Sequence, residues 1–389
     1  MKVLVTGAGG FLGERLVATL AGLRNAVSFP FWSERWTVRA AIRRPLSAYP
    51  VLSRTLAREP SSERSRVELF HGDLASVETA KRACEGCDVV IHTAGLAGVT
   101  GAAQQYYQAN VETTQNLLAA SRTFGIKYFV YTSSPSVVCD GRDLAGVNED
   151  YPYPKHYLCS YSETKALAER LVRAAEGVRT CALRPHLIWG PNDPHLVPKL
   201  IARARQGKLR PIGDGTNRMD VTYIDNAVQA HLLAVRSLLE SRVESGRVWF
   251  ISQGEPVNCW DFIDRLLTAV GVDSIRQRRP IAWPVAWGYG LCCEFLRTVS
   301  DHLPFRRGKN DRAMTGNMGV QTQRREEPPM TRFLAIQLAK SHYYDISRAK
   351  RELGYVPFVS VEEGIRRLVQ SYVKHGMMDA NATSAANLR

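Results

Sequence analysis

The sequence of 389 residues lacks an uninterrupted apolar run of the ~20 residues that a membrane-spanning helix needs. Its eight cysteines are irregularly spaced, which argues against a disulfide framework and favours reduced thiols in a cytoplasmic protein. Cys84 and Cys87 have no second cysteine pair and no histidine set beside them, so no metal site is expected. Because Met1-Lys2-Val3 leads directly into strand-like sequence, we also expect no signal peptide.

Acidic residues are fewer than basic ones, which leaves a net charge of +14. The basic residues are scattered rather than gathered in one Lys/Arg block with interleaved aromatics, so we expect no nucleic-acid partner. An anionic cofactor, an anionic substrate or an anionic membrane surface accounts equally well for the charge.

The N-terminus has the pattern of a dinucleotide site. A strand-like run at residues 3–5 is followed by a turn with glycines at positions 7, 10 and 13, and then by a helical pattern over residues 14–20. The backbone N–H groups of such a turn and the positive end of the helix dipole face a pyrophosphate. We therefore predict that a cofactor binds at Gly7, Gly10, Phe11, Leu12 and Gly13.

The second predicted strand, residues 37–42, ends in Arg43-Arg44 and lacks the acidic residue that would hydrogen-bond the ribose of NAD. Arginine suits the 2′-phosphate of NADP, so the sequence favours NADP, with Arg43 as the phosphate ligand, and leaves NAD open. The alternative is that both arginines only cap a solvated strand end. Residues 24–37 are longer than an ordinary connection and form an aromatic insertion of unknown role.

Further strands are predicted at residues 67–70, 88–92, 128–132, 180–185 and 247–252. The carboxyl ends of parallel strands form the ligand-binding edge of an open α/β sheet. At this edge we predict cofactor contacts by Asp73, Leu74, Ala94, Pro185 and Ile188, and a substrate-binding hydroxyl at Ser134. Serine at such a strand end can also be an ordinary turn or helix-capping residue.

Tyr161 and Lys165 are four residues apart in a helical pattern, so they project from the same helix face. A free tyrosine has a pKa of about 10, and a neighbouring ammonium would lower that pKa by favouring the phenolate. A tyrosine tuned in this way can act as a general acid or base. The spacing alone also occurs by chance on many amphipathic helices.

These patterns predict an α/β protein, with a Rossmann-type doubly wound parallel sheet and a smaller, mainly helical C-terminal substrate lobe. The NAD(P)-binding domain is placed at residues 1–185, with 219–253 returning to it. The substrate-binding lobe follows at 186–375, and a disordered tail at 376–389.

Residues 281–296 of the lobe are apolar except for Glu294. This stretch is expected to lie in a membrane interface, to line the mouth of an apolar pocket, or to be buried inside the lobe. The first reading predicts a peripheral membrane contact through residues 281–305. Residues 306–327, which are polar and of mixed charge, are expected to form a mobile loop.

The motifs resemble those of the extended short-chain dehydrogenase/reductases over nearly the whole chain. They are Thr6-Gly7-x-x-Gly10-x-x-Gly13, Asp73-Leu74, His92-Thr93-Ala94-Gly95, Ser134, Tyr161-x-x-x-Lys165 and Arg184-Pro185. Later motifs, at 183–191, 213–217, 222–226 and 344–355, resemble the 3β-hydroxysteroid dehydrogenase branch, which includes the sterol-4α-carboxylate 3-dehydrogenases. The runs 132–137, 188–191 and 330–334 are similar to bacterial reductases of 2-alkyl-3-oxoalkanoates.

The resemblance implies roles for individual residues. Tyr161 is the proton donor or acceptor, Lys165 binds the cofactor ribose and lowers the pKa of the tyrosine, and Ser134 hydrogen-bonds the substrate oxygen. Asn110 aligns only loosely with a structural asparagine of the family. His186 and Arg218 are candidates for binding a substrate carboxylate.

The implied activity is an NADPH-dependent reduction of the 3-oxo group of an apolar 2-alkyl-3-oxoalkanoate. The alternative within this class is a 3β-hydroxysteroid or sterol-4α-carboxylate 3-dehydrogenase. From another class, the chain could be a non-catalytic NADP-sensing regulator on the same fold. The family also implies a homodimer.

Overall fold

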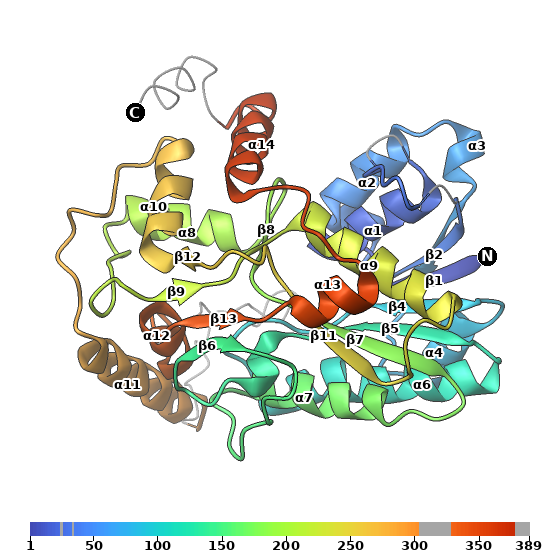
Figure 1. The fold of residues 1–389 in the computed structure, drawn as a ribbon, viewed down its shortest axis with the longest axis horizontal. Helices are drawn as coiled ribbons and strands as arrows, with labels where there is room; N and C mark the ends of the chain where they lie inside the picture. Colours follow the sequence, from blue (N-terminus) through green and yellow to red (C-terminus); the bar gives the residue numbers. More distant parts are fainter. Residues whose placement is uncertain (24–25, 33–34, 303–327, 378–389) are drawn as a thin grey trace, which may run out of the picture.

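The computed structural model describes residues 1–23, 26–32, 35–302 and 328–377. Its main element is a seven-stranded parallel sheet in the order β11-β7-β5-β4-β1-β2-β3, which confirms the predicted Rossmann-type fold (Figure 1). The strands are β1 (Lys2–Thr6), β2 (Thr37–Ile42), β3 (Val67–His71), β4 (Val89–His92), β5 (Tyr128–Thr132), β7 (Arg179–Pro185) and β11 (Arg247–Ile251).

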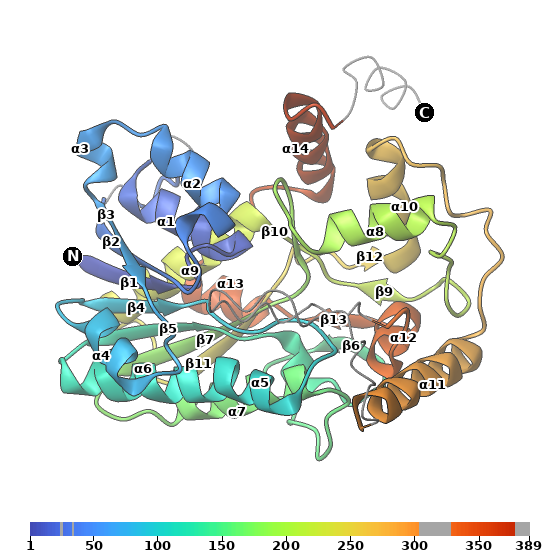
Figure 2. The same ribbon diagram turned by 180° about the vertical axis from the view of Figure 1, so that it is seen from behind.

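Helices cover both faces of this sheet (Figures 1 and 2). One face carries α4 (Val77–Cys84), α6 (Thr113–Thr123) and α7 (Ser160–Arg173), and the other carries α1 (Phe11–Ala21), α9 (Ile224–Leu239) and α13 (Ser347–Leu353). The central strands are therefore apolar on both sides, and all four residues of β4 are buried. The strand order reverses between β1 and β4, so a crevice forms beyond their carboxyl ends.

The C-terminal region is helical, as predicted, but it also contains short strands. Its helices are α8 (Leu196–Arg205), α10 (Cys259–Ala269), α11 (Trp283–His302), α12 (Arg332–Ala339) and α14 (Val361–Lys374). A second sheet, in the order β12-β9-β13-β6, consists of β6 (Leu144–Val147), β9 (Arg218–Met219), β12 (Val257–Asn258) and β13 (His342–Tyr344). Strands of two to four residues are too short for an alternating pattern to reveal them.

Short elements complete the fold. They are η1 (Leu46–Ala48), α2 (Pro50–Ala57), α3 (Ser61–Arg64), α5 (Ala103–Tyr106), η2 (Tyr107–Glu112), η3 (Pro135–Val138) and the pair β8 (Ile188–Trp189) with β10 (Thr222–Tyr223). Strand β11 pairs with β7, and α9 packs on the same sheet. The domain division at residue 185 stays a prediction. The predicted loop at 306–327 and residues 378–389 of the predicted tail lie outside the described residues.

The aromatic insertion at 24–37 packs against the rest of the protein where it is described. Phe29 and Trp36 are buried in the main core. The ring of Phe29 meets that of Phe358 edge-on at 5.4 Å between centroids. The insertion therefore contacts the segment that leads into α14.

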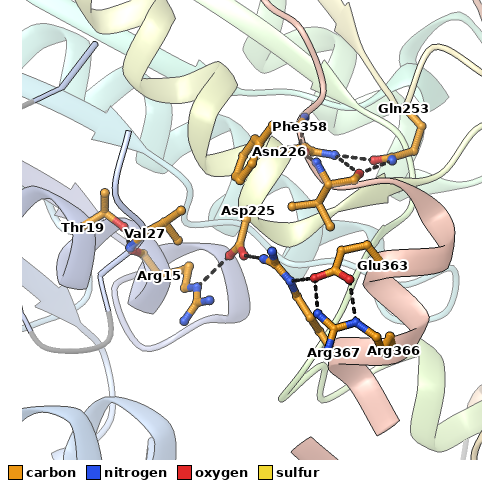
Figure 3. A network of polar contacts seen from close by, with 11 residues as sticks. Arg15, Thr19, Val27, Asp225, Asn226, Gln253, Phe358, Glu363, Arg366 and Arg367 are labelled. Carbon is orange, nitrogen blue, oxygen red and sulfur yellow. Dashed lines mark hydrogen bonds and ion pairs between the residues drawn. The ribbon is translucent and has the colours of Figure 1, made fainter. Parts of the chain in front are cut away.

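A polar network also connects the sheet region with α14 (Figure 3). The Asp225 carboxylate on α9 accepts from Arg15 Nε of α1 at 2.9 Å and from Arg367 of α14 at 3.2 Å. Glu363 binds Arg366 and Arg367 on the solvent side of α14. Because Asp225 is nearly inaccessible to solvent, its charge depends on these two arginines.

Helix α11 is not buried, which contradicts one of the three expectations for residues 281–296. Val285, Tyr289, Phe295 and Leu296 are all more than half exposed, and Phe295 and Leu296 reach 66%. None of the described helices is both long and apolar enough to cross a membrane.

Candidate active site

A cavity of ≈ 420 Å³ lies at the carboxyl edge of the sheet. Its lining combines strand ends with residues of α7, α8 and α12. The lining residues are Phe11, Leu12, Thr93, Gly95, Leu96, Ala97, Thr132, Ser133, Ser134, Ser136, Tyr161, Lys165, Pro185, His186, Leu187, Ile188, Asp193, His195, Leu196, Phe333, Gln337 and Tyr344. The walls are largely apolar, and Ser134, Tyr161 and Lys165 are among the polar residues of the lining.

The glycine turn brings the chain close to neighbouring backbone. Gly7 has a φ of +66°, and a Cβ there would lie 2.8 Å from the Ala94 nitrogen. A Cβ at Gly13 would lie 2.2 Å from the Gly7 oxygen. Helix α1 begins after Gly10 without a side-chain cap, which leaves its first N–H groups available to an anion. These features fit the pyrophosphate of a dinucleotide.

Ser134 and Tyr161 meet in the cavity. Ser134 follows β5 and caps η3 through a bond from Ser136 N at 3.2 Å, so the turn reading of this serine also holds. Its hydroxyl hydrogen-bonds the phenol of Tyr161, which by itself lowers the pKa of Tyr161. Burial outweighs that effect and raises the pKa of Tyr161 above its usual value of 10.0. The predicted net lowering of this pKa is therefore wrong.

Lys165 lies one turn further along α7 and also lines the cavity. Its Nζ donates to the Thr132 carbonyl oxygen at 2.6 Å and sits 4.2 Å from the centre of the Tyr131 ring. Burial lowers the pKa of Lys165 to about 7, while the charge of Glu169 opposes the shift. Lys165 can therefore exchange a proton near neutral pH.

Asn110, which aligns only loosely with a structural asparagine of the family, has a defined position in the structure. It lies in the π-helical segment η2 and is fully buried. Its Oδ1 accepts from Leu96 N at 2.7 Å, and its Nδ2 donates to Leu96 O and to Thr164 Oγ1 at 3.2 and 3.0 Å. One amide therefore fixes the loop after β4 against α7, next to Lys165.

Behind Lys165 lies a buried ion pair. Glu169 on α7 accepts from Arg184 Nε at 3.0 Å and from its Nη2 at 2.6 Å. Tyr153 also donates to Glu169. The Arg184 guanidinium lowers the pKa of Glu169 despite the raising effect of its burial, so this carboxylate stays charged beside Lys165.

The residues predicted for the adenosine end lie at the ends of β2 and β3. Arg43 and Asp73 are exposed, and Asp73 Oδ1 accepts from Ala75 N at 3.1 Å. Leu74 is buried in the second core cluster. The Arg44 guanidinium stacks over Tyr49 at 5.1 Å, and a Cβ at Gly9 would overlap the Tyr49 ring. Sequence patterns had given no role to Tyr49.

The two candidates for a carboxylate ligand do not fit. His186 lines the cavity, but its Nδ1 donates to the Asp220 carbonyl oxygen at 2.6 Å. Burial lowers the pKa of His186 to about 3, so the ring is neutral. Arg218 does not line the cavity; it donates to Pro256 O and stacks on Tyr343.

The predicted residues thus fall into two groups. Those that line the cavity are Phe11, Leu12, Ser134, Tyr161, Lys165, Pro185 and Ile188. Those that lie elsewhere along the sheet edge are Gly7, Gly10, Gly13, Arg43, Asp73, Leu74 and Ala94. Sequence reasoning assigned no site role to Leu96, His195, Gln337 and Tyr344. The motifs at 330–334 and 344–355 included Phe333 and Tyr344, and those motifs were the available signal for the two residues.

A larger and more open cavity of ≈ 590 Å³ lies beside α7, β11 and α13. Its lining is charged, and two of its arginines are already paired, Arg247 with Glu352 and Arg348 with Asp150. It contains none of the predicted catalytic residues. Within the described part of the chain no group of three His, Cys, Asp or Glu residues could hold a metal ion.

The sheet order, the glycine turn and the cavity at the switch point are those of an NAD(P)-dependent oxidoreductase of the short-chain dehydrogenase/reductase type. The chain belongs to the 3-beta hydroxysteroid dehydrogenase/isomerase family, whose model matches residues 4–281.

Relatives and solved structures agree with this membership. The chain is 40% identical to a 2-alkyl-3-oxoalkanoate reductase of Stenotrophomonas maltophilia, over 95% of this chain and 99% of the relative. It is 32% identical to the mouse sterol-4-alpha-carboxylate 3-dehydrogenase, decarboxylating, over 80% of this chain and 81% of the relative. The fold is similar to that of UDP-glucuronic acid 4-epimerase from Bacillus cereus, with a TM-score of 0.66 and 23% identity over 96% and 99% of the two chains.

Proposed function

We propose that this protein reduces the 3-oxo group of a 2-alkyl-3-oxoalkanoate to the 3-hydroxy acid, with NADPH as the reductant. The observation that carries the proposal is the meeting of Ser134, Tyr161 and Lys165 in one cavity with apolar walls. The 40% identity to a reductase of that name over nearly the whole chain supports the choice of substrate.

The residues divide the chemistry between them. Residues 7–13 would hold a nicotinamide cofactor, which when bound would supply the hydride for the carbonyl carbon. Tyr161 gives its proton to the carbonyl oxygen, and the Ser134 hydroxyl holds that oxygen in place. The raised pKa of Tyr161 keeps the phenol protonated at neutral pH, which suits the reducing direction. Lys165, which lines the same cavity, would bind the cofactor ribose.

Replacing Tyr161 by phenylalanine tests this assignment. Loss of the proton donor should lower kcat by about 10²- to 10⁴-fold, since that is the usual contribution of a general acid. Cofactor affinity, measured by fluorescence titration, should change little. Unchanged turnover of every candidate substrate would refute the assignment.

A substrate screen separates the alternatives. Nicotinamide absorbance is followed with a long-chain 2-alkyl-3-hydroxy acid and with a 3β-hydroxysteroid. Turnover of the steroid alone would favour a steroid or sterol-carboxylate dehydrogenase. Cofactor binding without turnover of either substrate would favour an NADP-sensing regulator.

The preference for NADP rests on Arg43, which is exposed at the end of β2 where the 2′-phosphate is expected. Arg43→Ala should raise the KM for NADPH by about 10- to 100-fold, since hydrogen bonds to charged groups contribute about 1.5–3 kcal/mol, and leave the KM for NADH nearly unchanged. Arg54→Ala, on the exposed side of α2, serves as the control. Equal use of NADPH and NADH by the wild type would contradict the preference.

We further propose that the exposed apolar face of α11 contacts a lipid surface. Its aromatic and aliphatic side chains and the net charge of +14 suit an anionic bilayer interface. The double variant Phe295→Asp/Leu296→Asp should no longer sediment with vesicles that contain anionic lipid, whereas the wild type should. If the wild type does not sediment and light scattering gives a dimer that the variant loses, a second copy of the chain covers this face instead.

A further inference from the structure

The proposed substrate carries a carboxylate two bonds from the carbonyl carbon, and the inference below rests on the proposed function. When the carbonyl oxygen lies at Ser134 and Tyr161, the carboxylate must lie in the same cavity. A carboxylate away from bulk water needs a cation or several hydrogen-bond donors. The cavity lining must therefore provide a cation or hydrogen-bond donors for the substrate carboxylate.

Three candidates are excluded by their contacts. The Lys165 ammonium donates to Thr132 O, and in the proposed function its other N–H groups bind the cofactor ribose. His186 uses its one ring N–H on Asp220 O, so its free Nε2 can only accept a hydrogen bond. The start of α8 is closed to an anion because the Asp193 carboxylate accepts from the three backbone N–H groups of residues 195, 196 and 197, at 2.8, 3.1 and 3.0 Å.

His195 is the remaining basic side chain of the described lining, and its position fits the requirement. His195 is exposed, lines the cavity and is the N-cap residue of α8. Its backbone N–H is fixed by Asp193, whereas no hydrogen bond or ion pair to the described residues engages its imidazole. The backbone of His195 is thus fixed at the cavity, and its imidazole is available to a ligand.

We propose that His195 binds the substrate carboxylate and thereby selects 3-oxo acids over neutral ketones. Asp193 is the one acidic residue of the described lining, and its charge is met by the three amide hydrogens and by the positive end of α8. The apolar side chains of Leu196 and Phe333 form part of the same wall, which the alkyl chains of the proposed substrate can contact. The histidine therefore acts on substrate specificity and not on proton transfer to the carbonyl.

The test compares a substrate that carries the carboxylate with the corresponding neutral ester. A 2-alkyl-3-hydroxyalkanoate and its methyl ester are oxidised with NADP, because the hydroxy acid does not lose CO₂ as a 3-oxo acid does. His195→Gln should raise the ratio of the KM for the acid to the KM for the ester by about 10- to 100-fold, as expected for loss of a charge-assisted hydrogen bond. His195→Arg should restore most of the ratio. His375→Gln, at the C-cap of α14, should leave the ratio unchanged.

The outcomes separate the two proposals. If the wild type oxidises the acid and His195→Gln leaves the ratio unchanged, the role of His195 is wrong and the proposed function stands. If His195→Arg fails to restore the ratio while its thermal unfolding matches the wild type, charge recognition is also wrong. If the wild type oxidises neither compound, the proposed function fails and the inference fails with it.

Discussion

Two buried carboxyl groups near the cavity, those of Glu169 and Asp220, differ in whether a charged partner lies beside them. Glu169 is matched by the guanidinium of Arg184, which makes burial of the charge tolerable. Asp220 has no ion-pair partner among the described residues. Its Oδ2 accepts from Tyr344 N at 2.8 Å, and the Ser252 hydroxyl also hydrogen-bonds this carboxylate. Burial therefore raises the pKa of Asp220 from 3.8 to about 7.

Asp220→Asn should stabilise the protein at alkaline pH. The folded pKa lies above the unfolded one, so the cost of the buried carboxylate is absent below about pH 4, grows as the pH rises, and is complete above about pH 7. A shift of about three pKa units corresponds to roughly 4 kcal/mol. Urea denaturation should give a higher free energy of unfolding for the variant at pH 8 and little difference at pH 4. Asp273→Asn, at an exposed site, is the control.

At the scale of secondary-structure elements, α12 connects the surface with the cavity. It supplies Phe333 and Gln337 to the cavity wall and packs on its other side against α11. The two helices approach closely at Gly290, where a Cβ would lie 2.6 Å from the Thr331 carbonyl carbon. The position of the cavity wall therefore depends on a contact made at the exposed helix.

Gly290→Ala should displace α12 and weaken substrate binding. Backbone atoms cannot move aside as a flexible side chain would, so we expect a loss of about 1–3 kcal/mol in the free energy of unfolding. The KM for substrate should rise more than kcat falls, because α12 contributes no proton donor. The matched control is Gly288→Ala in the same helix, where a Cβ meets nothing within 4 Å. This substitution should stabilise the helix by up to about 1 kcal/mol.

At the scale of the whole molecule, α1, α9 and α14 come from three distant parts of the chain and meet at Asp225 (Figure 3). Helix α1 begins at the glycine turn, so the same contact anchors the C-terminal helix to the helix at which we predict the cofactor pyrophosphate to bind. The homodimer that the family resemblance implies stays a prediction.

Asp225→Ala should destabilise the protein and loosen α14. Loss of two charged hydrogen bonds to one nearly inaccessible carboxylate should cost about 2–3 kcal/mol. Denaturation curves give this value, and limited proteolysis should cut the variant first near α14. Arg366→Gln is the control, because its pair with Glu363 lies at the surface and should contribute less than about 1 kcal/mol. Equal stability of both variants would contradict a central role for Asp225.

The sequence alone determined the main sheet, because buried parallel strands and a glycine turn are local patterns with strict physical requirements. It also determined the Tyr161–Lys165 pair, since a spacing of four residues fixes a shared helix face. Only the tertiary structure decided the electrostatics: burial raises the pKa of Tyr161 and lowers that of Lys165 to about 7, and Lys165 donates to Thr132 O. It likewise decided that α11 is exposed and that His195 lines the cavity, because such positions depend on how distant elements pack and leave no local pattern.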